Sequence, residues 1–139
     1  MRALLAVALL AGVSMAREDD DHLGPHKGPV VEWGEEEYHL EVVADRKTGE
    51  VTVYVYGDHK DLHKGKAAAI DSKSLILSLK TTNPATTVKL EPKPTKDDPS
   101  GRSSVFVGKN AAFKTDKKLT GTIGGKVGSK PYTGDFKEK

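Results

Sequence analysis

Apolar and polar residues alternate along most of the chain with a period of two, which is the pattern of β-strands that bury one face. In residues 38–43 this alternation places Tyr38, Leu40 and Val42 on one face. Residues 51–56 are rich in β-branched and aromatic side chains, and a turn cluster at residues 45–49 separates the two segments. We therefore predict a β-hairpin from residue 38 to residue 56.

Further short segments carry apolar residues at alternate positions, and turn residues bound each of them. They are residues 74–79, 87–90, 103–107, 119–123 and 132–136. The apolar phase of these strands predicts five core side chains: Leu40, Val42, Val53, Leu75 and Leu77. Residues 64–71 and 109–114 contain alanines but lack helical periodicity over two turns. The pattern indicates an all-β fold: an antiparallel sandwich of about seven strands, immunoglobulin-like, or a small barrel.

The first sixteen residues are a segment of another kind. Arg2 precedes an apolar run over residues 3–13, and Ser14-Met15-Ala16 supplies the small residues that a signal peptidase requires. The run is shorter than the ~20 apolar residues that span a bilayer. We predict a cleavable signal peptide over residues 1–16, a flexible polar leader over 17–29 and one domain over 30–139. The location is then periplasmic or secreted, without membrane insertion after cleavage.

The amino-acid composition and the absence of catalytic motifs reduce the number of possible functions. The chain has no cysteine, which excludes disulfides and thiolate chemistry. Its 22 Lys and Arg nearly balance its 20 Asp and Glu, so a nucleic-acid partner is not expected. Neither a Gly-x-Ser-x-Gly nor a His-Glu-x-x-His motif is present, and we do not expect an enzyme.

All five histidines lie in one third of the chain, at positions 22, 26, 39, 59 and 63. Neutral imidazole is a common ligand of zinc and copper. His39 and Glu41 stand two apart on a predicted strand and so share a face, and His26 can fold over them as a third ligand. The alternative is that His39 and Glu41 form an exposed pair on the solvent face. His22 and His26 can also belong to a merely solvated tail.

His59 and His63 form a second, weaker candidate. They fall in a charged connection between two predicted strands, and one helical turn would bring them together as i and i+4 neighbours. The alternative is an ordinary solvated loop, in which Lys60 and Lys64 would repel a cation.

Several short motifs carry a resemblance to known proteins. They are Pro25-His26-Lys27-Gly28-Pro29, residues 37–43, residues 51–55, Asp98-Pro99-x-Gly101-x-Ser103-Ser104-x-Phe106-Val107 and Pro131-Tyr132-Thr133-Gly134. The chain resembles uncharacterised small exported proteins of planctomycete-type bacteria. Its His and His-x-Glu segment is also similar to an N-terminal segment of periplasmic heavy-metal efflux adaptors. The second resemblance implies a metal role for His26, His39 and Glu41.

The expected function is therefore an exported β-sandwich binding module for a divalent transition metal, with Zn²⁺ or Cu²⁺ as the ion. The alternative is a structural or interaction domain of the cell envelope, whose partner is another envelope protein and whose histidines have no metal role.

Overall fold

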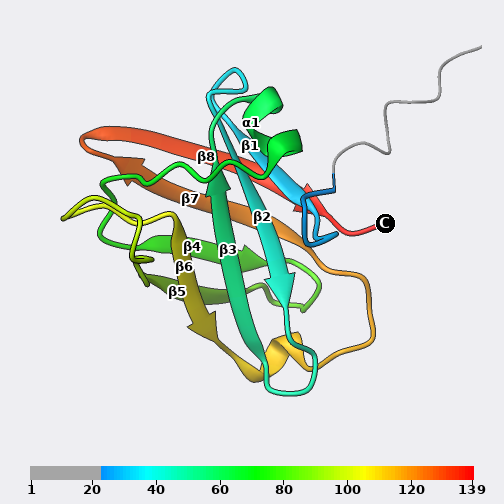
Figure 1. Ribbon diagram of the computed structural model, residues 1–139. Coiled ribbons are helices and arrows are strands. Elements are labelled where there is room, and N and C mark those ends of the chain that lie inside the picture. Colours follow the sequence, from blue (N-terminus) through cyan, green and yellow to red (C-terminus); the bar gives the residue numbers. More distant parts are fainter. Residues whose placement is uncertain (1–22) are drawn as a thin grey trace, which may run out of the picture.

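The computed structural model describes residues 23–139 and shows eight antiparallel strands in one sheet (Figure 1). The strands are β1 (Val30–Trp33), β2 (Tyr38–Ala44), β3 (Glu50–Tyr56), β4 (Leu75–Leu79), β5 (Thr86–Pro92), β6 (Val105–Lys109), β7 (Thr120–Val127) and β8 (Lys130–Lys137). Two short helical segments accompany them, α1 (His59–Lys64) and the 3-10 turn η2 (Ala111–Phe113). Within residues 23–139, no helix is long and apolar enough to cross a membrane.

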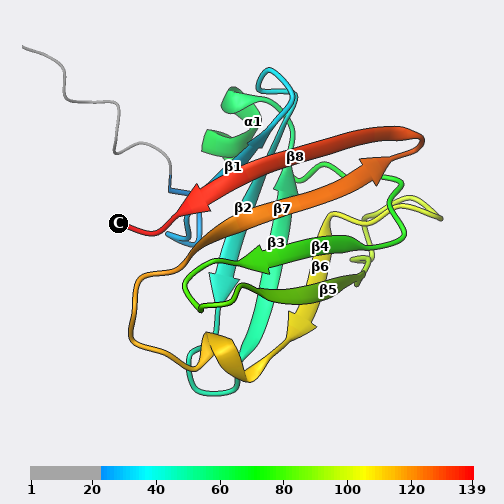
Figure 2. The same cartoon turned by 180° about the vertical axis from the view of Figure 1, so that it is seen from behind.

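The sheet has the strand order β1-β2-β3-β6-β5-β4-β7-β8 and folds over on itself. Strands β5 and β6 pair over only two residues, so the sheet turns a corner between them. Strands β2 and β3 consequently run across β4, β5, β7 and β8, as the front and back views show (Figures 1 and 2). The two ends of the sheet also approach each other, because a Cβ atom at Gly134 of β8 would lie 2.4 Å from the carbonyl oxygen of Glu32 in β1. The architecture is an almost closed barrel.

The expected all-β antiparallel class is confirmed, and so is the hairpin formed by β2 and β3. The immunoglobulin-like sandwich is not confirmed, since the strands follow one another in a single folded sheet. The count rises from about seven strands to eight because β1 carries too few alternating residues to stand out. The connection after β3 contains the short helix α1, at the place where one helical turn was considered for His59 and His63.

The interior of the barrel is apolar. All five predicted core residues, Leu40, Val42, Val53, Leu75 and Leu77, are buried with at most 1% of their surface exposed. Trp33 of the edge strand β1 is buried with them, and its indole N–H donates to the carbonyl oxygen of Ile123 at 3.1 Å. Burying these side chains supplies most of the stability that a chain without disulfides requires.

The opposite face of β2 is covered as well, which excludes one alternative and corrects one expectation. His39 and Glu41 are fully buried, so they do not form the exposed pair that was the alternative to a metal site. Residues 23–29, expected as the end of a flexible leader, fold into a turn that packs on β2, with the Gly24 N–H donating to the Gly28 carbonyl at 2.9 Å. Residues 1–22, with the predicted signal peptide and His22, lie outside the described residues.

Candidate metal centre

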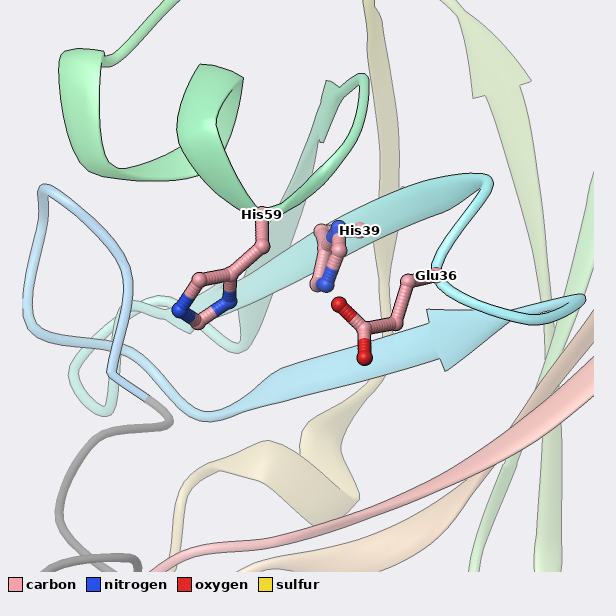
Figure 3. Close-up of side chains that lie close together, drawn as sticks. All are labelled: Glu36, His39 and His59. Carbon is pink, nitrogen blue, oxygen red and sulfur yellow. The ribbon is translucent and has the colours of Figure 1, made fainter.

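Three potential metal ligands from consecutive elements converge at one end of β2 (Figure 3). Glu36 comes from the turn between β1 and β2, His39 from β2 itself, and His59 from the first position of α1. One ligand atom from each of the three lies within 4.8 Å of the other two. The arrangement therefore offers two imidazoles and one carboxylate to a common point.

His39 is the fixed member of this centre. Its side chain is fully buried, and its Nδ1 lies 2.8 Å from the carbonyl oxygen of Gly57. Because a carbonyl oxygen only accepts, Nδ1 carries the proton and Nε2 presents a lone pair. Within the described part of the chain this Nε2 is buried without a hydrogen-bond partner. An unsatisfied buried polar atom costs about 1–3 kcal/mol, which coordination of a metal ion would recover.

Glu36 is the exposed member, and its backbone has an unusual conformation. Its φ of 64° lies in the left-handed region, which costs an ordinary residue about 1–2 kcal/mol. The turn is closed by a hydrogen bond of 3.1 Å from the Glu37 N–H to the Trp33 carbonyl. This conformation brings the Glu36 carboxylate back over β2 towards His39, as Figure 3 shows.

His59 is placed by the short helix α1. The Asp58 carboxylate caps the helix by accepting a hydrogen bond of 3.0 Å from the Asp61 N–H, and Gly65 ends it in the left-handed conformation. The buried side chain of Leu62 anchors the helix, packing with Val30 and Tyr56. The ring centroids of His39 and His59 are then 5.9 Å apart.

Charges around the centre are mixed. The hydrogen bond from the Asp61 N–H holds the pKa of the Asp58 carboxyl below its ordinary value, with a smaller contribution from Lys60. Asp58 therefore stays ionised beside the centre at neutral pH. The negative charges of Asp58 and Glu36 oppose the positive charges of Lys60 and Lys64. From the sequence, these two lysines were expected to repel a cation.

The structure gives Glu41 and His26 a different role from the one the sequence suggested. Glu41 accepts hydrogen bonds of 2.8 Å from the N–H groups of His26 and Gly28 through one oxygen. Its other oxygen lies 2.9 Å from Nδ1 of His26 and accepts a bond of 3.1 Å from the hydroxyl of Tyr56. Both oxygens of Glu41 are thus engaged in fastening the N-terminal turn to β2.

Packing around this fastening is close. A Cβ atom at Gly24 would lie 2.3 Å from the carboxyl carbon of Glu41, so only glycine fits at that position. Burial, and then the charge of Glu41, raises the pKa of the Tyr56 hydroxyl, which therefore stays protonated as a donor. The ring of His26 stacks on Tyr54 with 4.1 Å between centroids. Glu41 and His26 accordingly act as structural residues, and Glu36 takes the place of Glu41 beside His39.

The second predicted pair does come together. His59 and His63 lie on one side of α1 with their Nε2 atoms 2.9 Å apart. The sequence treated this pair and His39 as separate candidates, because period-two alternation does not tell which connection folds back over a strand. It missed Glu36 altogether. The available signal was a run of three glutamates, Glu35 to Glu37, at the tip of a turn that follows Gly34.

Comparisons with protein-family models, with curated proteins and with solved structures find no match to this chain.

Proposed function

We propose that this protein is a binding module for a divalent transition metal, held by Glu36, His39 and His59. The observation that carries the proposal is the buried Nε2 of His39, which has no hydrogen-bond partner within residues 23–139 and faces a carboxylate and a second imidazole (Figure 3). The cost of leaving such an atom unsatisfied is removed when it ligates an ion.

The donor set favours Zn²⁺ or Cu²⁺. Two imidazole nitrogens and one carboxylate oxygen suit these ions better than Ca²⁺ or Mg²⁺, which prefer all-oxygen sites. Zinc–nitrogen and zinc–oxygen bonds of ~2.0–2.2 Å require the three ligand atoms to approach one another slightly. The exposed side chain of Glu36 can make that movement while His39 stays in place. Three protein ligands leave a further position of the ion open.

The test compares two neighbouring glutamates. Glu35 and Glu36 are both exposed, but only Glu36 belongs to the cluster. We expect untagged protein to bind Zn²⁺ or Cu²⁺ with micromolar or tighter affinity in titration calorimetry. Glu36→Gln removes the charged ligand and should weaken binding at least tenfold, about 1.4 kcal/mol, whereas Glu35→Gln should leave the affinity unchanged.

His26→Gln provides a second control, because His26 is an accessible imidazole that lies outside the cluster. Equal affinities for the wild type and Glu36→Gln, or a loss confined to His26→Gln, would contradict the proposed centre. The alternative of an interaction domain without a metal role would then be the better description.

We also infer export to the periplasm or the medium, on the sequence of residues 1–16 alone. Arg2, the apolar run and the small residues before Arg17 support cleavage after Ala16. N-terminal sequencing of protein recovered from outside the cytoplasm should begin at Arg17. Recovery of the chain only from the cytoplasm, with residues 1–16 still attached, would contradict this inference.

A further inference from the structure

The two ring nitrogens of His59 face different neighbours. Its Nε2 lies 2.9 Å from Nε2 of His63, and the two rings meet edge to face at 88°. Figure 3 shows one ring nitrogen of His59 on the side of His39 and Glu36 and the other facing away. Because Nε2 is engaged with His63, Nδ1 is the nitrogen that remains for the metal centre.

The contact between the two imidazoles needs one donor and one acceptor. If His63 donates, Nε2 of His59 must be unprotonated, and a neutral His59 ring then carries its proton on Nδ1. That form cannot ligate through Nδ1. If His59 donates from Nε2 to Nε2 of His63, the lone pair on Nδ1 is free. Ligation and this second direction of the hydrogen bond therefore require the same tautomer of His59.

We propose that His63 is a positioning residue of the metal centre: it accepts the Nε2 proton of His59 and so holds Nδ1 ready to ligate. The proposal rests on the proposed function of Glu36, His39 and His59. His63 then acts on His59 as the Gly57 carbonyl acts on His39. Each imidazole is oriented through the nitrogen that faces away from the ion, an arrangement whose loss typically costs 10–100-fold in metal affinity.

The surroundings of His63 favour this role. It lies four residues after His59 in a helix whose two ends are both capped, so the spacing of the rings is set by the backbone. Its side chain is exposed, so a substitution there leaves the core intact. Gln and Leu are both good helix formers, and only Gln keeps an acceptor at that position.

The experiment measures Zn²⁺ affinity of the full chain and the state of each imidazole nitrogen. We expect His63→Gln to stay within about threefold of the wild type and His63→Leu to bind at least tenfold more weakly. Long-range proton–nitrogen NMR at pH 8 should show an unprotonated Nδ1 of His59 before zinc is added. Zinc should then shift Nδ1 of His59 and Nε2 of His39.

The outcomes separate this proposal from the proposed function. Equal affinity for His63→Leu and the wild type, or a protonated Nδ1 of His59 in the metal-free protein, would overturn the role of His63. A zinc-induced shift at a nitrogen of His63 would also overturn it, because His63 would then be a ligand. Absence of any zinc effect on His39 would overturn the centre itself, while the metal-free spectrum would still decide the direction of the hydrogen bond.

Discussion

Glu36 combines an unfavourable backbone conformation with a place in the proposed metal centre. Its left-handed φ is one that glycine adopts without steric cost. We therefore expect Glu36→Gly to raise the free energy of unfolding by about 0.5–1 kcal/mol, because relief of strain exceeds the entropy cost of glycine. The same change should abolish tight metal binding. Urea denaturation and zinc titration of one protein sample measure both effects.

Glu35→Gly is the matched control for that prediction. Glu35 is exposed in the same turn but has no left-handed φ, so glycine there should lower stability slightly and leave metal affinity unchanged. Equal stability changes for the two variants would show that the backbone of Glu36 is not strained.

At the scale of residues, the sequence located the histidines of the centre but not their surroundings. Alternation correctly separated His39 and Glu41 from the core face of β2. It left open whether their face formed a metal site or was exposed to solvent, because a period of two reports sidedness and not what lies above the strand. The turn at residues 23–29 and helix α1 cover that face, and their contacts depend on hydrogen bonds to Glu41 and on the packing of Leu62.

The long connection between β5 and β6 is organised by one carboxylate. Asp98 accepts bonds of 2.9 Å from the N–H groups of Thr95 and Ser104 and from the Ser104 hydroxyl. Partial burial opposes ionisation of Asp98, but these hydrogen bonds outweigh it and hold its pKa below the ordinary value. We expect Asp98→Ala to lower the free energy of unfolding by about 1–2 kcal/mol at neutral pH.

Because the pKa of Asp98 is lowered in the folded protein, the stabilisation by its carboxylate depends on pH. The folded state favours the ionised form, so the stabilisation is complete above the unfolded pKa of about 3.9 and is lost as pH falls through the lower folded value. The difference between wild type and Asp98→Ala in urea denaturation should therefore shrink below about pH 4. A difference that stays constant from pH 7 to pH 2.5 would show that the charge of Asp98 makes no contribution.

Among the elements, long alternating strands were predictable and short ones were not. The hairpin of β2 and β3 has alternation on both strands and a turn cluster between them. Strand β1 has four residues with three buried, Val30, Val31 and Trp33, so it shows no clear period. Helix α1 has six residues and one buried side chain, Leu62, which is too little for a helical pattern. Capping by Asp58 and Gly65 defines this helix better than its hydrophobicity does.

Across the whole molecule, closure of the barrel depends on a close approach between its first and last strands. A Cβ atom at Gly134 would lie 2.4 Å from the Glu32 carbonyl and 2.7 Å from a methyl group of Val31. Gly134→Ala should therefore push β8 away from β1 and destabilise the fold by about 1–3 kcal/mol. Gly124→Ala on β7 is the control, because its nearest atom would be 3.5 Å away.

Chemical denaturation and hydrogen exchange check this prediction together. Gly134→Ala should accelerate amide exchange in β1, whereas Gly124→Ala should leave it unchanged. Similar stabilities for the two alanine variants would indicate that the seam between β1 and β8 tolerates a side chain. The sequence left a sandwich and a small barrel open, because alternation does not encode which strands of a sheet become neighbours across a fold.

The centre is drawn from a short stretch of chain, since every group in it lies between Glu36 and His63. The strand pairings that complete the barrel join residues much farther apart, such as β3 with β6, and non-local pairings form slowly during folding. The ligands are therefore expected to assemble early, on the local hairpin and the helix that follows it. If the proposed centre holds a metal ion, that ion finds its ligands together before the distant strand pairs have formed.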